Sequence, residues 1–337
     1  MKNLFKIRNL VLLTIMALLG VACSSSDTTT TPTTTADLTI TGVASGNANL
    51  SILVQALIRA NLATTLQGSG SFTVFAPTNA AFTTFLTANG YADINAVPVP
   101  ELTQILLNHV VIGSVLSSAL ADNTYIKTLA VGTASTTNKL SMYVTVIAGA
   151  VKLNGSSNVI TANIAASNGI IHVVDKVIAL PTIVTFAVAN PNLSTLVSAL
   201  TYAGQPAFTT ILAGTGPFTV FAPTNAAFSQ TTVPVGFLQE FNFANLGAIP
   251  AATLTSVLQY HVANGNVVSS SLANNQVIQT LAGTMSGQAF TVLVTGTGGG
   301  TVISIKDANN RVAKVVLADI QASNGIIHVL DKVLKPM

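Results

Sequence analysis

The residues of this chain best suited to acid–base chemistry are two histidine–aspartate pairs. His172 and Asp175 belong to the segment NGIIHVVDKVI, and His328 and Asp331 belong to the similar segment NGIIHVLDKVL. A histidine next to a carboxylate is a common general base. Both segments are rich in β-branched residues and predict strands, in which residues three apart point to opposite faces. The spacing therefore predicts that these four side chains support the fold rather than catalysis.

The other two histidines, His109 and His261, each end an apolar stripe typical of a helix. At helical spacing before them lie Leu102, Ile105 and Leu106 in one case and Leu254, Val257 and Leu258 in the other. We expect a helix over 100–110 and a matching helix that ends near His261. Aliphatic neighbours predict buried rings whose nitrogens bond to the backbone. A hydrolase that uses His261 or His328 is the weaker alternative.

The chain offers no pattern typical of a metal site or a bound cofactor. There is no HxxxH or HxH spacing, and Cys23 is the only thiol, so zinc and calcium sites lack ligands. The glycine cluster 296–300 lies between two predicted strands without a following helix, which predicts a hairpin loop rather than a phosphate cradle. We expect no catalytic residue, no metal and no cofactor, and hence a protein that is not an enzyme.

Two long motifs occur twice, in the same order. FTVFAPTNAAF begins at residue 72 and again at residue 218, an offset of 146 residues, and the NGIIHV motif begins at 168 and 324, an offset of 156. A period of this length is that of a whole domain. The sequence predicts one domain over 38–180 and a second over 181–337.

Each copy reads as helices followed mainly by strands. An apolar stripe at helical spacing begins at residue 50 and at residue 193. In FTVFAPTNAAF a β-rich run is broken by Pro77 or Pro223, and we expect Thr78 or Thr224 to cap the next helix. Later strands are predicted over 139–147, 170–177, 289–294, 302–306 and 326–333. This order of helices and antiparallel strands predicts an α+β fold in each domain.

The N-terminus predicts export and lipid anchoring. Basic residues precede an uncharged apolar run that ends in small residues, which is typical of a signal peptide over 1–22. The residues before Cys23 resemble a bacterial lipobox, with Gly20 in place of the usual leucine, and imply a lipid on Cys23. A Ser/Thr-rich tract then predicts a disordered tether over 23–37. A permanent N-terminal anchor helix is the alternative.

The charge balance predicts that nucleic acid is not a partner. The chain carries 13 Lys and Arg against 10 Asp and Glu, but the three excess positive charges lie in the predicted signal peptide. The rest of the chain has no net charge and offers no basic surface. With only 7% charged residues, the domains should present Thr, Ser, Asn and Gln to water and bind through short-range contacts.

The duplicated motifs resemble those of fasciclin-like domains. The similarity lies in TVFAPTNAAF, in a histidine at the end of a mid-domain helix, and in the closing NGIIHVVDKVI, and it extends from Asp37 to Met337. The resemblance implies two tandem domains, each a β-wedge or sandwich flanked by α-helices. It also implies adhesion, because members of that family are mostly secreted or surface-anchored adhesion proteins.

The resemblance further implies a binding motif. Tyr260 and His261 match a Tyr-His pair implicated in receptor binding in animal members, whereas the first copy has Asn108 before His109. We expect binding where the copies differ: at Asn108 and Tyr260, in the insertion near 230–245, and in the glycine loop.

These inferences combine into one functional expectation. We expect a cell-envelope lipoprotein, held at the outer membrane or cell surface by Cys23, that contacts a surface protein or glycan as a monomer or with weak self-association. The alternative is a carbohydrate-capturing accessory lipoprotein of a nutrient-uptake system, which the absence of tryptophan disfavours because sugars stack on aromatic rings.

Overall fold

The computed structural model describes residues 39–337, except 69, 232–234, 284–287 and 297–299. The predicted signal peptide, Cys23 and the predicted tether therefore lie outside the described residues, as does the centre of the glycine cluster. Residues 37–337 form one compact unit.

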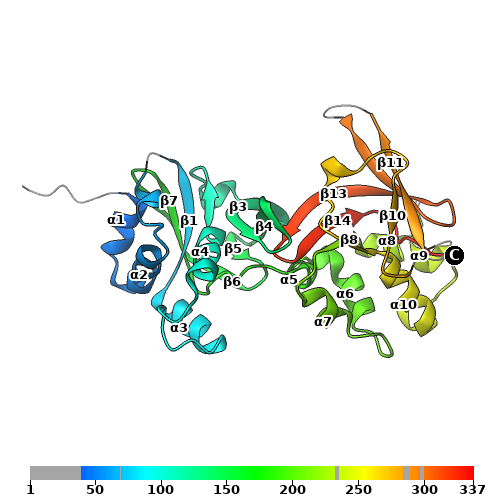
Figure 1. Cartoon of the computed structure of the whole chain (residues 1–337), viewed down its shortest axis with the longest axis horizontal. Coiled ribbons are helices and arrows are strands. Elements are labelled where there is room, and N and C mark those ends of the chain that lie inside the picture. Colours follow the sequence, from blue (N-terminus) through cyan, green and yellow to red (C-terminus); the bar gives the residue numbers. More distant parts are fainter. Residues whose placement is uncertain (1–38, 69, 232–234, 284–287, 297–299) are drawn as a thin grey trace, which may run out of the picture. The chain divides into compact units, whose positions relative to one another are not determined.

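The first copy begins with helices and ends with strands (Figure 1). Its α-helices are α1 (Ile40–Ser45), α2 (Ser51–Arg59), α3 (Asn79–Ala88) and α4 (Val99–Asn108). Its strands are β1 (Phe72–Pro77), β2 (Val110–Ile112), β3 (Thr124–Gly132), β4 (Ser135–Ile147), β5 (Ala150–Leu153), β6 (Ser157–Ala166) and β7 (Gly169–Val174). The predicted α+β fold is confirmed.

The second copy repeats this order. Its α-helices are α5 (Ile183–Ala189), α6 (Ser194–Leu200), α7 (Phe208–Ala213), α8 (Asn225–Ser229), α9 (Phe237–Glu240) and α10 (Ala251–Tyr260). Its strands are β8 (Phe218–Pro223), β9 (Val262–Asn264), β10 (Val277–Gln279), β11 (Ala289–Thr295), β12 (Val302–Lys306), β13 (Val312–Ala322) and β14 (Gly325–Leu330). Helix α9 lies in the insertion that the sequence singled out.

The strands of both copies follow one topology. In the first copy, β1 to β7 close into a barrel in sequence order. In the second, the order β10-β11-β12-β13-β14-β8-β9 is the same, but no ladder joins β9 to β10 among the described residues. Leu281 bridges that seam by donating its N–H to the carbonyl of Val262 at 2.7 Å.

The first strand of each copy pairs in parallel with the last. Strand β1 runs beside β7 from Phe72 to Pro77, and β8 runs beside β14 in the same register. The sequence predicted antiparallel strands and did not foresee this pair. The closing strands are also shorter than expected, ending at Val174 and Leu330. The carboxylate of the next residue, Asp175 or Asp331, then accepts a backbone N–H of the neighbouring strand.

The turn before each closing strand is fixed by an asparagine and a glycine. Asn324 accepts the N–H of Ile183 at 3.0 Å and donates to the carbonyls of Leu212 and Gly214 at 2.8 and 2.7 Å. Gly325 follows, and a Cβ at that position would collide with the carbonyl oxygen of Phe218. Asn168 makes the matching contacts in the first copy. The NG pair thus ties the helical layer to the sheet.

Each copy has an apolar core on both sides of its central strands. One cluster lies between helices and sheet, around Phe82 in the first copy and Phe228 in the second. The other lies inside the strands, around Phe75 and Phe221. Both phenylalanine pairs come from FTVFAPTNAAF, because alternate residues of its strand face opposite sides and the following helix turns its phenylalanine back onto the sheet.

The two copies contact each other within the compact unit. Tyr143 of β4 packs into the helix-side core cluster of the second copy. The ring of Tyr125 meets Phe186 of α5 edge-on, with ring centres 5.5 Å apart. The ammonium of Lys127 donates to the carbonyl of Asp319 at 2.8 Å. Apolar and polar contacts therefore join the copies.

Candidate functional site

The two helix-end histidines occupy equivalent interior positions. His109 and His261 are the C-caps of α4 and α10 and are 1% and 3% exposed. The Nδ1 atom of each ring lies 2.7 Å from the carbonyl oxygen four residues earlier. The Nε2 atom accepts the backbone N–H of Ile178 in the first copy and of Leu334 in the second, at 2.8 and 2.9 Å. Each ring joins a helix end to the segment after the closing strand.

These hydrogen bonds require neutral rings. Because Nε2 accepts an N–H, the ring proton sits on Nδ1, where it is donated to the helix carbonyl. Burial lowers the pKa of both His109 and His261 to about 4, and the carbonyl bonds oppose that shift only in part. In this arrangement neither ring can exchange protons with a bound substrate.

Asn108, which precedes the first helix-end histidine, is fully buried. Its Nδ2 donates to the carbonyls of Ile178 and Ala179, both at 3.1 Å, and its Oδ1 accepts the hydroxyl of Thr128 at 3.3 Å. The side chain therefore bonds to the segment that leads into the second copy.

Tyr260, at the equivalent position of the second copy, is also fully buried but bonds to other partners. Its hydroxyl donates to the carbonyl of Ala289 at 2.7 Å and accepts the N–H of Ala308 at 3.1 Å. Burial raises the pKa of this phenol to about 12. Asn108 and Tyr260, which differ between the copies, are thus both inside the protein, where they bond to different segments of their domains.

The strand histidines are buried as well. His172 donates through Nε2 to the carbonyl of Val115 at 2.9 Å, and His328 to that of Val267 at 2.8 Å. Each ring lies 5.4 Å, centre to centre, from a core phenylalanine, Phe75 or Phe221. Burial lowers the pKa of both rings.

The aspartates three residues later bond elsewhere. Asp175 accepts the backbone N–H and the side-chain amide of Asn158, both at 2.7 Å. Asp331 accepts the backbone N–H of Lys314, also at 2.7 Å. Neither carboxylate bonds to its histidine, so the structure brings no catalytic dyad together at these positions.

The remaining motif residues end a strand and begin a helix. Pro77 and Pro223 are the last residues of β1 and β8. The hydroxyls of Thr78 and Thr224 then accept the N–H of Ala81 at 3.1 Å and of Ala227 at 3.3 Å as N-caps of α3 and α8.

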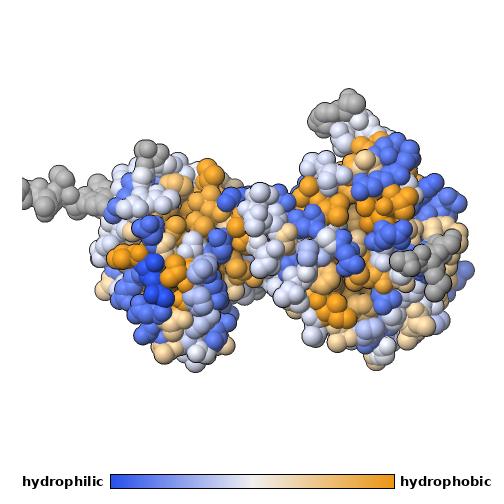
Figure 2. Space-filling model, in the orientation of Figure 1, coloured by the Kyte–Doolittle hydropathy of each residue, from blue (hydrophilic) through white to orange (hydrophobic). Residues whose placement is uncertain are grey.

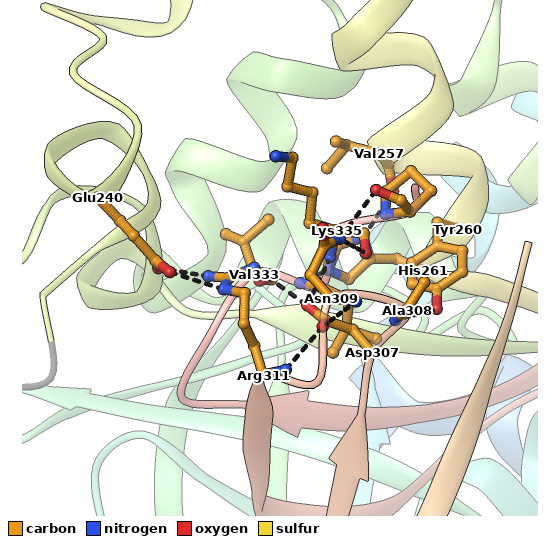
Figure 3. Close-up of polar contacts among 12 residues, drawn as sticks. Glu240, Val257, Tyr260, His261, Asp307, Ala308, Asn309, Arg311, Val333 and Lys335 are labelled. Atoms are coloured by element: carbon orange, nitrogen blue, oxygen red, sulfur yellow. Dashed lines mark hydrogen bonds and ion pairs between the residues drawn. The ribbon is translucent and has the colours of Figure 1, made fainter. Parts of the chain in front are cut away.

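Beside Tyr260 lies a charged cluster that the sequence analysis missed (Figure 3). The side chain of Asp307, only 1% exposed, accepts the N–H groups of Asn309, Arg311 and Lys335. It also pairs with the guanidinium of Arg311 at 3.1 Å. Four donors therefore hold this buried carboxylate in the turn between β12 and β13.

Arg311 extends the cluster to the insertion. Its guanidinium meets the carboxylate of Glu240 with two bonds, at 2.8 and 2.5 Å, and donates to the carbonyl of Val333 at 3.0 Å (Figure 3). The ring of Phe241 lies 5.2 Å from this guanidinium and 4.1 Å from the ammonium of Lys335. The Asp307–Arg311 spacing is a local signal, but Glu240 is 71 residues away and no local pattern identifies it.

The described residues also bear on metal binding and on membrane insertion. Within the described ranges, no three His, Cys, Asp or Glu side chains gather in a way that could hold a metal ion. In the same part of the chain, no single helix has the length and apolarity to cross a bilayer; one pair, Ile183–Ala189 with Pro191–Leu200, meets those criteria jointly but is bent by 100°.

The sequence model of the fasciclin domain matches this chain twice, at residues 48–181 and 191–336. Protein sll1483 of Synechocystis sp. is 36% identical over 157 residues, which cover 46% of this chain and 73% of that protein. Human periostin is 29% identical over 274 residues, 80% of this chain but only 29% of periostin. Immunogenic protein MPB70 of Mycobacterium bovis is 34% identical over 148 residues, 44% of this chain and 65% of that protein.

Among solved structures, a FAS1 domain pair from the insect cell adhesion molecule Fasciclin I shares the fold. The match has a TM-score of 0.53 at 20% identity and covers 86% of this chain and 97% of the insect chain. It therefore includes both copies.

Proposed function

Since the chain belongs to the fasciclin-domain family and carries two copies of the domain in tandem, we propose that it is a non-enzymatic adhesion protein of the cell surface. Its partner would be another surface protein or a glycan. The observation that carries the proposal is the family membership of both copies, together with a solved relative described as a cell adhesion molecule.

The burial and hydrogen bonds of the histidines and aspartates support a binding protein rather than an enzyme. All four histidines are buried and bonded to backbone, and their neighbouring aspartates bond to other groups. A general base must reach the proton it removes. In the described residues these motif side chains have no such access.

The surface of the domains supports binding through short-range contacts. Figure 2 shows apolar and polar residues intermixed over the visible face. Large apolar side chains such as Ile112 and Val277 are 71% and 58% exposed. Asn108, His109, Tyr260 and His261 are each at most 3% exposed and cannot touch a partner directly. We propose that they affect binding indirectly, by fixing the segments to which they are hydrogen-bonded.

Lipid anchoring is the second part of the proposal. We propose that a signal peptide is removed before Cys23 and that a lipid on this residue holds the domains at the outer membrane or cell surface. Two weak sites on one tether would gain effective concentration at a neighbouring surface.

Adhesion is tested by deleting residues 38–337 and measuring cell attachment and matrix cohesion. Loss of attachment, restored by the intact chain, is expected; unchanged attachment would refute the adhesion role. Anchoring is tested separately with Cys23→Ser, which should move the protein from the membrane to the soluble fraction. If the variant remains with the membrane, the lipid assignment is wrong.

A further inference from the structure

A groove of about 620 Å³ lies where the turns around β5 meet helix α5. Its lining includes Ile147 and Lys152 from the first copy and Val188 from the second. The two sides come close at Gly155, where an added Cβ would lie 2.9 Å from the Cβ of Ala189. The groove exists only because both copies are present.

Among the lining residues, Asn154 has a buried amide nitrogen that lacks a partner. Asn154 is 6% exposed, and its Oδ1 accepts the N–H of Tyr143 at 2.8 Å, but its Nδ2 has no hydrogen-bond acceptor. A buried donor without an acceptor is destabilising, because it has lost its hydrogen bonds to water. This nitrogen has almost no accessible surface, so only a movement of the side chain would bring it to a ligand in the groove.

The equivalent position of the second copy is fully bonded. Asp307 follows β12 as Asn154 follows β5, and its carboxylate is held by Arg311 and by the N–H of Lys335. The first copy has an amide in place of that carboxylate. Only the first copy leaves its side chain incompletely bonded.

The charge of the groove selects an acidic ligand. Lys152 is exposed, and both ion pairs formed by the described residues belong to Arg311, so within that part of the chain Lys152 has no carboxylate partner. None of the described residues that line the groove is acidic. An exposed cation without acidic neighbours is complementary to a carboxylate.

The apolar lining favours a peptide over a sugar. Ile147 and Val188 are 71% and 65% exposed, although both are large aliphatic side chains. No aromatic ring is among the described residues that line the groove, so a sugar ring has no stacking partner. Aliphatic side chains of an extended peptide would cover both residues.

We propose that this groove binds a short extended segment of a partner protein in which an acidic residue neighbours an aliphatic one. The carboxylate pairs with Lys152, and the aliphatic side chain packs between Ile147 and Val188. This inference rests on the proposed adhesion role and names the site and the chemistry of its partner.

The test measures binding of labelled peptides to the purified full chain by fluorescence anisotropy. The probes are octapeptides of alternating valine and glutamate, valine and glutamine, or valine and lysine. The glutamate peptide is expected to bind roughly tenfold more tightly than the lysine peptide. Lys152→Glu should reverse that order, and Val188→Asp, which replaces an aliphatic contact with a negative charge, should weaken the glutamate and glutamine peptides.

The controls separate this proposal from folding and from the general adhesion role. Both substituted residues are exposed, so the melting temperature should be unchanged, and Lys314→Glu, at an exposed lysine outside the groove, should bind like the wild type. Failure of every peptide to bind at about 1 mM, equal binding by Lys152→Glu, or binding of an acidic oligosaccharide at this groove instead would overturn the peptide site. Cell attachment that persists in Lys152→Glu and Val188→Asp would leave the adhesion role standing while removing the groove from it.

Discussion

His261 accepts the backbone N–H of Leu334 at 2.9 Å, so a single ring at the end of α10 fixes the segment that follows β14. The same ring donates to Val257 within its own helix at 2.7 Å. His109 and Ile178 repeat this relationship in the first copy. The histidine therefore acts as a two-sided linker between a helix and the end of its domain.

Replacing this linker should destabilise the second copy. His261→Ala removes both bonds and leaves a cavity, so we expect a loss of about 2–4 kcal/mol in the free energy of unfolding. Urea unfolding followed by circular dichroism measures it, with the exposed Ser270→Ala as the control. A loss no larger than that of the control would contradict the linker role.

Stability should fall as the pH drops from about 6.5 to about 4. Burial lowers the folded-state pKa of His109 and His261 to about 4, whereas the unfolded chain has the ordinary value of 6.5. Above pH 6.5 both states are neutral and the stability is fully present. Below it the unfolded chain binds protons that the folded chain cannot, which costs up to about 1.4 kcal/mol per pH unit for each histidine.

The measurement is the free energy of unfolding in urea at pH 7, 5.5 and 4.5. The His109→Gln and His261→Gln variants should show a shallower decline than the wild type, because glutamine takes up no proton. An equally steep decline in the double variant would assign the effect to other groups.

Two substitutions in the charged cluster should lower the free energy of unfolding by different amounts. Arg311→Ala leaves the buried carboxylate of Asp307 without its cation, and we expect a loss of about 3–5 kcal/mol. Glu240 is more exposed, with 27% of its side chain accessible, so Glu240→Gln should cost only about 1 kcal/mol. Thermal or urea unfolding of both variants tests this order, and the reverse order would contradict it.

Replacing the asparagine before each closing strand should lower the free energy of unfolding. Asn324→Ala removes three hydrogen bonds from a side chain that is 3% exposed, and we expect a loss of about 2–4 kcal/mol. Asn168→Ala should cost less, because one of its bonds is longer, at 3.3 Å, and the residue is only half-buried. The matched pair is compared by urea unfolding, and equal small losses would show that the turn does not depend on these bonds.

Local patterns predicted the parts of the fold that depend on neighbouring residues. The apolar stripes predicted the helices α2, α4 and α10. The proline and threonine of FTVFAPTNAAF predicted the end of the strand and the cap of α3. Strand β12 has the predicted limits, 302–306. These features are decided by side-chain periodicity and turn chemistry within a few residues.

Relationships across long separations could not be predicted in this way. The parallel pairing of Phe72 with Gly169 depends on the closing of the whole domain. The bond between Glu240 and Arg311 joins an insertion to a distant turn. The unpaired amide of Asn154 is visible only once its surroundings are known, because the sequence shows an ordinary Asn-Gly turn. The candidate groove combines residues of both copies and was not expected.

The pairing of each first strand with the last has a consequence for synthesis. A nascent chain that has emerged only as far as residue 168 still lacks the whole of β7, so β1 is left with one neighbour instead of two. Each domain can therefore complete its fold only after nearly its full length is released, and a prematurely terminated chain retains an uncovered strand edge.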